Sequence, residues 1–287
     1  MTKTIFIVAG PTASGKSARA IELAQENNGV IINADSMQIY NALPLLSAQP
    51  SAEDIKAAPH LLYGHLHPNQ DCSAGAWQRM AKPLIESTLA EGRTPIICGG
   101  TGLYIKALTN GLSPIPETPS EIRAATSALM QEIGCAALHA KLEARDPLIK
   151  GRFHPNHSAR IMRAWEVLEA TGKSIITWQA EPLIAPPADW NFKTEIILPD
   201  RETLYASCEK RFDWMLNNGA LEEVKAFASR MIEENIAETA LITNALGFKP
   251  LRAYLAKETT LEAATKQAKQ DTRNYAKRQS TWFKNQF

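Results

Sequence analysis

The 287-residue chain has few cysteines, no long apolar segment and no excess of charge of one sign. Its cysteines, Cys72, Cys98, Cys135 and Cys208, lie far apart and form no Cys-x-x-Cys pair. This pattern argues against a disulfide framework and a zinc ribbon, and it fits a cytoplasmic protein. No run of about 18 apolar residues occurs, so we expect no transmembrane helix and no membrane partner. The net charge of +1 does not by itself indicate a nucleic-acid partner.

The chain does contain short apolar runs that end in polar or glycine-rich sequence. Runs at 4–9, 30–34 and 95–98 predict buried strands, and the segments 16–27 and 74–91 between them predict helices. Strands alternating with helices predict an α/β fold with a parallel sheet flanked by helices. Ligands bind such sheets at the C-terminal ends of the strands. The first run leads directly into a glycine motif, so we interpret it as a core strand and not as a signal peptide.

The composition changes after Gly111. Residues 112–120 hold three prolines and predict a loop, whereas residues 121–173 predict helices without a strand. Residues 194–198 resemble a strand again, and the pattern from 202 onward is helical. We therefore predict a sheet domain that is interrupted by an all-helical insertion. The predicted divisions are 1–114 for the first part of the core, 115–190 for the insertion and 191–287 for the completion of the core.

A complete G-x-x-x-x-G-K-[ST] motif follows the first predicted strand and precedes a predicted helix. Its glycines let the backbone wrap a phosphate, and the following helix adds its positive N-terminal end. Lysine then supplies a point charge, and serine a hydroxyl for Mg²⁺. The motif predicts a bound diphosphate or triphosphate, with a chance glycine turn as the alternative. It comprises Gly10, Pro11, Thr12, Ala13, Ser14, Gly15, Lys16 and Ser17.

Two further candidates lie at the ends of the second and third strands. Asp35 could hold Mg²⁺, act as a general base or cap a helix. Thr101 is flanked by Gly99, Gly100 and Gly102, so its hydroxyl could approach a ligand closely, or the segment could be only a tight turn.

The C-terminal segment is strongly basic. Residues 266–287 carry six Lys and Arg against Asp271 alone, which indicates a surface for phosphate backbones or merely a solvated basic helix. Trp282 and Phe283 could stack on bases, but we interpret this pair as core anchors. The histidines do not form a convincing metal site, because no fourth ligand is evident.

Several motifs, taken together, resemble the tRNA dimethylallyltransferase family. They are the phosphate motif, Asp35-Ser-Met-Gln-Ile-Tyr40, Gly99-Gly-Thr-Gly-Leu-Tyr104, Arg160-Ile-Met-Arg163-Ala-Trp-Glu-Val167, Ala245-Leu-Gly-Phe-Lys249, Tyr275-Ala-Lys-Arg-Gln279 and Thr281-Trp-Phe283. The resemblance covers nearly the whole chain, and its specificity comes from the joint occurrence and order of the motifs. The chain departs from the family pattern at Gln49, where a lysine is usual, and at His157 and Trp165.

The resemblance implies a P-loop NTPase-like fold and transfer of a dimethylallyl group from dimethylallyl diphosphate to N6 of the adenine 3′ of the anticodon. It implies that Asp35 accepts the N6 proton and that Thr101 donates a hydrogen bond to a diphosphate oxygen. Lys16, with Mg²⁺ at Ser17, would neutralise the leaving diphosphate, and Arg211 would clamp it.

The resemblance also implies a tRNA anticodon stem-loop as partner of a cytoplasmic monomer. The residues implied in tRNA binding are Asp35, Ser36, Met37, Gln38, Thr101, Arg123, Ala159, Arg160, Ile161, Met162 and Arg163. On a helix, Arg160 and Arg163 would share one face, with Ile161 toward another. Surface ion pairs with Glu166 and Glu169 are the alternative reading of the two arginines.

Three other functions would share part of this pattern. An adenylate dimethylallyltransferase acting on free AMP would share the first motifs, but a mononucleotide needs neither a helical insertion nor a basic C-terminal helix. A P-loop nucleotide kinase would transfer phosphate from ATP. A P-loop RNA-binding protein without catalytic activity would not release diphosphate from the donor.

Overall fold

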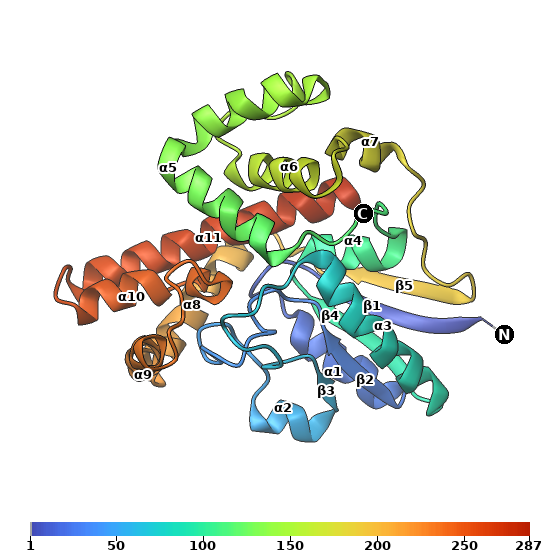
Figure 1. Cartoon of the computed structure of the whole chain (residues 1–287). Coiled ribbons are helices and arrows are strands. Elements are labelled where there is room, and N and C mark those ends of the chain that lie inside the picture. Colours follow the sequence, from blue (N-terminus) through green and yellow to red (C-terminus); the bar gives the residue numbers. More distant parts are fainter. Residues whose placement is uncertain (1) are drawn as a thin grey trace. The chain divides into compact units, whose positions relative to one another are not determined.

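The computed structural model describes residues 2–287, which form two compact units (Figure 1). One unit contains the chain up to Thr109 together with Pro187–Phe287, and the other is Asn110–Pro186. Each unit has its own hydrophobic core. The sequence predicted the two divisions after residues 114 and 190.

The first unit is built on a five-stranded sheet with the strand order β3-β2-β4-β1-β5, in which all neighbours are parallel. The predicted parallel α/β fold is therefore confirmed. β5 begins four residues earlier than the sequence predicts, and β3 was not predicted. The strands are β1 (Lys3–Ala9), β2 (Gly29–Asn33), β3 (His60–Leu61), β4 (Thr94–Gly99) and β5 (Trp190–Ile196).

Helices cover both faces of this sheet. Alternate side chains of each strand point to opposite faces, so Ile5 and Ile7 join one apolar cluster, and Val8 joins another. All three side chains are fully buried, which accounts for the continuous apolar runs in the sequence. The helices of the unit are α1 (Lys16–Glu26), α2 (Ala52–Ala57), α3 (Ala74–Ala90), α4 (Gly102–Asn110, which ends one residue into the second unit), α8 (Arg201–Asn217), α9 (Ala220–Glu233), α10 (Phe248–Leu255) and α11 (Leu261–Gln286), with a 3₁₀ turn at Leu241–Asn244.

The C-terminal ends of β2 and β4 are held tightly together. The Ala34 amide donates to the Cys98 carbonyl at 2.8 Å, and the Thr101 amide donates to the Ala34 carbonyl at 3.1 Å. A Cβ atom at Gly99 would lie 2.2 Å from the Ala34 carbonyl oxygen, so only glycine fits there. This close approach brings the Asp35 and Thr101 segments side by side.

The second unit is helical, as predicted. It contains α5 (Ser120–Arg145), a 3₁₀ turn (Pro147–Ile149), α6 (Ser158–Thr171) and α7 (Ile175–Ala180). Gly134 interrupts α5 with φ 78°, a left-handed conformation that glycine adopts without strain. Within residues 2–287, no helix is long and apolar enough to span a bilayer.

Candidate active site

The phosphate motif forms an open cradle between β1 and α1. Gly15 precedes α1 with φ 91°, and no side chain caps the helix there. The first backbone N–H groups of α1 are therefore available to an anion. A Cβ atom at Gly10 would lie 2.4 Å from the Ile197 carbonyl oxygen, so this position requires glycine. The Ser14 hydroxyl is buried and has no hydrogen-bond partner within the described residues, as expected where a polar ligand is to bind.

Lys16 lies at the start of α1 with its side chain buried. Burial lowers the pKa of its ammonium, whereas the nearby Asp35 carboxylate raises it. The only hydrogen bond of this ammonium within the described chain goes to the Pro11 carbonyl, at 3.3 Å. A buried cation with so little compensation favours binding of an anion beside it.

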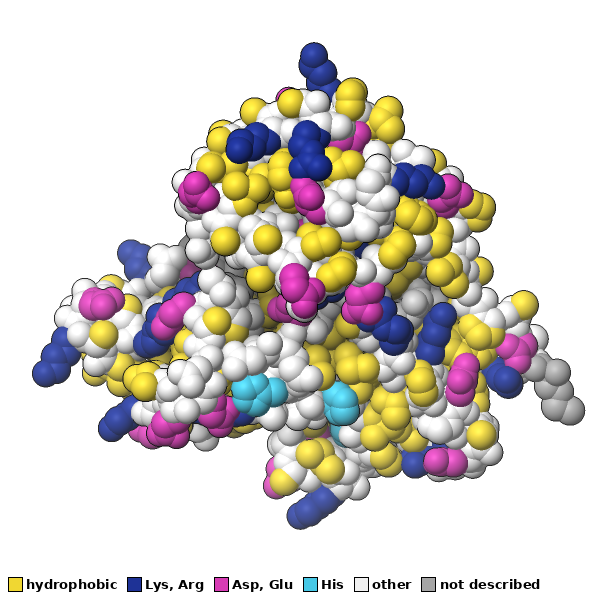
Figure 2. Space-filling model, viewed as in Figure 1, with side chains coloured by type: hydrophobic (Ala, Val, Ile, Leu, Met, Phe, Trp, Pro, Cys, Tyr) yellow, Lys and Arg dark blue, Asp and Glu magenta, His cyan; other side chains and the backbone are white. Residues whose placement is uncertain are grey.

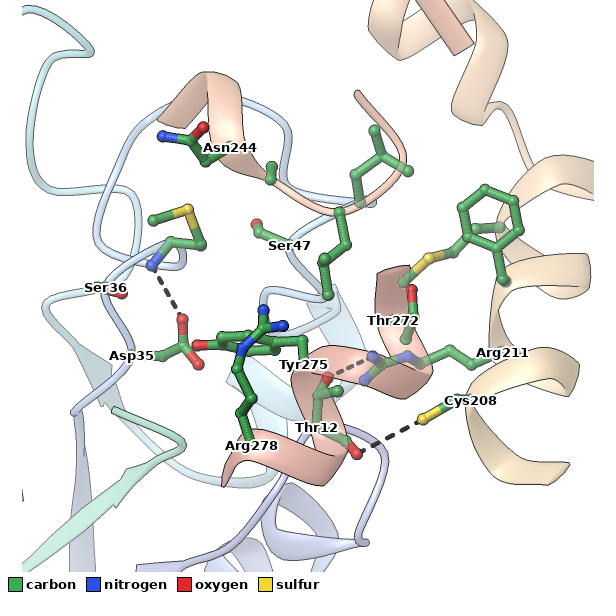
Figure 3. Close-up of a pocket in the computed structure, with 16 residues that line it drawn as sticks. Thr12, Asp35, Ser36, Ser47, Cys208, Arg211, Asn244, Thr272, Tyr275 and Arg278 are labelled. Carbon is green, nitrogen blue, oxygen red and sulfur yellow. Dashed lines mark hydrogen bonds between the residues drawn. The ribbon is translucent and has the colours of Figure 1, made fainter. Parts of the chain in front are cut away.

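A pocket of about 280 Å³ lies at this edge of the sheet (Figure 3). Its polar lining comes from Thr12, Asp35, Ser36, Ser47, Cys208, Arg211, Asn244, Thr272, Tyr275 and Arg278, and its apolar lining from Met37, Leu46, Phe212, Met215, Ala245 and Leu246. The pocket can therefore accommodate a ligand that has both a charged part and an apolar part.

The two oxygens of Asp35 are used differently. Oδ1 accepts hydrogen bonds from the Met37 amide at 2.9 Å and the Gln38 amide at 3.4 Å, which is the capping role that the sequence left open. Within residues 2–287, no hydrogen bond reaches Oδ2. The carboxylate is thus held in place by one oxygen while the other can accept a proton from a ligand.

Thr101 lies beside this segment but does not line the pocket. Its Oγ1 accepts a hydrogen bond from the Ser36 amide at 2.9 Å and donates to Ser36 Oγ at 3.2 Å. Thr101 therefore fixes the backbone that follows Asp35.

Arg211 reaches the pocket from α8 and donates a hydrogen bond to Thr12 Oγ1 in the phosphate motif. Burial lowers the pKa of its guanidinium, with Cys208 and Asp35 acting in the opposite direction. Within the described chain it forms no ion pair. The structure places Arg211 beside the cradle, where its guanidinium is free to meet an anion.

α11 contributes residues to which the sequence analysis gave no role in the site. Gln279 is buried and bridges two motifs, because its Oε1 accepts from the Thr12 amide at 2.8 Å and its Nε2 donates to the Gly100 carbonyl at 2.8 Å. Tyr275 points its hydroxyl toward Asp35 (Figure 3), and burial together with that carboxylate raises the pKa of the phenol. The available sequence signal was the presence of polar residues on the inward face of an amphipathic helix.

The sequence pattern of the IPP transferase family matches residues 38–286, and that of isopentenyl transferases matches residues 3–66. The chain belongs to the IPP transferase family. It is 48% identical to a tRNA dimethylallyltransferase of Paramagnetospirillum magneticum over 98% of this chain and 87% of that protein. It is 45% identical to the enzyme of the same name from Rhodospirillum centenum, over 99% of this chain and 90% of that protein.

Solved structures of family members are also similar. A eukaryotic dimethylallyltransferase described as acting on tRNA matches with a TM-score of 0.83 and 27% identity, covering 98% of this chain and 70% of that one. A tRNA isopentenylpyrophosphate transferase from Bacillus halodurans matches with a TM-score of 0.66 and 32% identity, covering 100% of this chain and 88% of that one.

In this family member, one wall of the pocket is a loop held from two sides. Glu223 of α9 accepts hydrogen bonds from the Leu45 amide at 2.6 Å and the Leu46 amide at 2.9 Å. From the other side, Gln38 Nε2 donates to the carbonyls of Ser47 at 3.0 Å and Ala48 at 2.6 Å. Gln38, which the resemblance places beside the acceptor base, therefore has its amide nitrogen committed to the loop.

Ser17 faces a second, smaller hollow of about 50 Å³, which Gln38, Gln49, Asp54 and His60 also line. The side-chain oxygens of Ser17, Gln38, Gln49 and Asp54 suit Mg²⁺, which takes few protein ligands and keeps several waters. Within residues 2–287, there is no cluster of three or more His, Cys, Asp or Glu that could hold a metal alone. Gln49 Nε2 donates to the Tyr40 carbonyl at 2.8 Å.

The other predicted tRNA-binding residues lie in the helical unit. Arg123, near the start of α5, lies 4.0 Å from Glu117, and Ala159 and Arg160 are exposed at the start of α6. Met162 is half-buried. Ile161 is buried in the core, and its amide donates to the His157 carbonyl at 3.0 Å.

Arg163 differs from Arg160 because it has partners in its own unit. Its Nη1 donates to Thr118 Oγ1 at 2.6 Å and lies 3.7 Å from Glu166. The ion pair of Arg163 with Glu166, which the sequence offered as the alternative to RNA binding, is therefore present. Glu169 forms its ion pair with Arg145 instead.

Proposed function

We propose that this chain transfers a dimethylallyl group from dimethylallyl diphosphate to N6 of adenine 37, the base 3′ of the anticodon, in tRNA. The reaction breaks the bond between C1 of the donor and the diphosphate oxygen, forms a bond between C1 and N6, and releases diphosphate and one proton. The observation that carries the proposal is the pocket itself. One pocket is lined both by Asp35, whose Oδ2 is unengaged, and by the half-buried Arg211, whose guanidinium donates to Thr12 of the phosphate cradle.

The cradle would bind the diphosphate of the donor. Backbone amides at the start of α1, the Lys16 ammonium and the Arg211 guanidinium would stabilise the negative charge that grows on the diphosphate as the C1–O bond breaks. These charges act strongly because burial has removed much of their water. Ser17 would hold Mg²⁺ together with the phosphates, and that ion would supply further charge neutralisation. Leu46, Phe212 and Met215 would surround the apolar part of the donor.

Asp35 would accept the N6 proton as the new bond forms. Exocyclic N6 is a weak nucleophile because its lone pair is delocalised into the ring, so removal of the proton during attack lowers the barrier. Met37 and Gln38 would hold Oδ1, leaving Oδ2 to take the proton. Thr101 would act through Ser36 by fixing this segment, and we propose no direct contact with the diphosphate in the arrangement seen here.

The adenine would have to leave the anticodon loop to reach Asp35, which costs a few kcal/mol of unstacking. We propose that contacts to the anticodon stem-loop offset this cost. In the helical unit they would come from Arg123, Arg160 and Arg163 and from the exposed start of α6 at Ala159. We propose that the protein acts as a monomer in the cytoplasm.

Mass analysis of nucleosides from tRNA treated with purified protein and donor tests the proposal. We expect the mass of one dimethylallyl group on the adenosine 3′ of the anticodon, and release of one diphosphate per modification. Modification of free AMP but not of tRNA, or transfer of labelled phosphate from ATP, would replace the proposal with one of the alternative activities.

A further inference from the structure

The pocket of the candidate active site ends in an apolar wall. On the face of the molecule shown in Figure 2, apolar side chains lie among polar and charged ones, as is usual for a protein surface. In the pocket, three large apolar side chains come together instead: Leu46, Phe212 and Met215 line it and are only 5%, 3% and 4% exposed. All three belong to the main hydrophobic core, so packed protein and not solvent lies behind them.

One face of α8 runs along the pocket. Four lining residues share this face because they are spaced i, i+3, i+4 and i+7; they are Cys208, Arg211, Phe212 and Met215. Arg211 donates to the Thr12 hydroxyl, and the Cys208 thiol lies 3.9 Å from the Thr12 carbonyl oxygen, so this part of the face meets the phosphate cradle. Met215 follows Arg211 after four residues, about 6 Å along the helix axis. The apolar part of the face therefore extends only about one helical turn beyond the contact with the cradle.

The ring of Phe212 is held in place from behind by the backbone of Gly247. A Cβ atom at Gly247 would lie 2.7 Å from Phe212 Cε2 and 3.4 Å from Leu46 Cδ2, so this backbone is packed directly against both side chains. Its φ of 92° is a left-handed conformation that favours glycine. Because protein interiors are close-packed and yield little, the ring has no room to retreat on this side. The wall is therefore a fixed limit of the pocket.

The length of this apolar part matches one isoprene unit. Each isoprene unit lengthens a prenyl chain by four carbon–carbon bonds, about 5 Å in an extended zigzag at about 1.5 Å per bond. The roughly 6 Å from Arg211 to Met215 accommodate one unit beyond the diphosphate but not two. We propose that Phe212, fixed by Gly247 and flanked by Met215, limits the donor to five carbons and excludes the ten-carbon geranyl diphosphate. This inference rests on the proposed function and identifies the residue that determines the specificity for the donor.

The test opens the wall at two positions, each with a matched control. Phe212→Leu is compared with Phe227→Leu, and Met215→Ala with Met231→Ala. Phe227 and Met231 are buried to nearly the same degree in the same core but do not line the pocket. For each protein, kcat/KM for transfer to tRNA is measured with dimethylallyl diphosphate and with geranyl diphosphate. Calorimetry without tRNA gives the affinity for each donor, and inhibition by inorganic pyrophosphate reports on the cradle.

Geranyl transfer would break the C1–O bond and form the C1–N6 bond as in the proposed reaction, so only the fit of the prenyl chain differs. We expect the unmodified protein to discriminate against geranyl diphosphate. Phe212→Leu should raise the ratio of kcat/KM for geranyl to that for dimethylallyl diphosphate by at least about ten-fold, since a single methylene in a hydrophobic pocket changes discrimination by about 10–200-fold. Met215→Ala should raise the ratio as well. Pyrophosphate affinity should stay within about two-fold, and the two control variants should keep the ratio of the unmodified protein.

The proposal is overturned if the folded Phe212→Leu or Met215→Ala protein keeps the ratio of the unmodified protein, or if the unmodified protein uses both donors equally well. An equal rise in the ratio for Phe227→Leu would also overturn it, because general loosening of the core would then be the cause. Transfer from dimethylallyl diphosphate together with an unchanged ratio rejects the wall alone. Absence of transfer from either donor rejects the proposed function, and the calorimetric affinities then decide whether the wall discriminates between the two chains.

Discussion

Replacing Gln279 by glutamate should loosen the link between the phosphate cradle and the end of β4. The substitution keeps the shape of the side chain and the acceptor for the Thr12 amide. It replaces the amide that donates to the Gly100 carbonyl at 2.8 Å by an oxygen that cannot donate when ionised. Leaving the buried Gly100 carbonyl without its partner costs about 1–3 kcal/mol. We therefore expect Gln279→Glu to lower the free energy of unfolding by about 1–3 kcal/mol near neutral pH.

The destabilisation by Gln279→Glu should depend on pH, and the direction of that dependence follows from the burial of the introduced carboxyl. The introduced carboxyl would be buried, so its pKa in the folded state would be raised above the value in the unfolded chain. Its destabilising effect is then fully present above the folded-state pKa and declines as the pH falls from that value to the lower pKa of the unfolded chain. Once protonated, the group can again donate to the Gly100 carbonyl. Stability relative to the unmodified protein should therefore recover between about pH 8 and about pH 5.

Urea unfolding at both pH values measures this effect, and titration with inorganic pyrophosphate measures its consequence at the cradle. Gln131→Glu, the same change at an exposed position of the helical unit, is the matched control and should alter stability by less than about 0.5 kcal/mol. Pyrophosphate should bind more weakly to Gln279→Glu at the higher pH, because a negative charge then lies beside the Thr12 amide. Equal stability of the two variants at both pH values would refute the reasoning.

Two further predictions concern Glu223, which holds the loop at 45–48, and Lys16 of the phosphate cradle. Glu223→Gln should raise the donor KM and cost about 1–3 kcal/mol of stability, because an amide NH₂ would face the Leu45 or Leu46 amide; kinetics equal to those of the exposed control Glu222→Gln would contradict it. Burial lowers the pKa of Lys16, so pyrophosphate affinity should be greatest below that pKa and should fall as the pH rises through it. Lys16→Arg should bind without that decline, since arginine stays charged, and an identical decline in both proteins would exclude Lys16 as its cause.

Local sequence was sufficient to predict the parts of the site that lie in the segments directly after the strands. The phosphate motif, Asp35 and Thr101 each follow directly after an apolar strand, so one parallel sheet brings them to one edge. The strands themselves were recognisable because burial on both faces requires a continuous apolar run. β5 was misjudged at its start because it lies at the edge of the sheet and alternates with exposed polar residues. β3 was missed because two residues carry no pattern.

The residues that complete the pocket could not be predicted in the same way. Gln279 meets Thr12 across 267 positions of sequence, and Arg211 meets Thr12 across 199. Such contacts depend on how α8 and α11 pack, which helical periodicity alone does not specify. The motif resemblance identified Arg211 and the segment 275–279, whereas the roles of Gln279 and Tyr275 become visible only in three dimensions. The role of Glu223 likewise could not be predicted, because nothing in the sequence of α9 indicates that this residue holds a loop.

The central claim is that Asp35 accepts the proton of the attacking amine while the cradle holds the diphosphate. Single-turnover transfer by Asp35→Asn tests it most directly, because asparagine keeps an oxygen for the Met37 and Gln38 amides and removes only the base. With protein saturated by tRNA and donor, we predict a rate lower by roughly 10²–10⁴-fold, with tRNA affinity unchanged within about two-fold. A rate within a few-fold of the unmodified protein, at equal substrate saturation, would contradict the account.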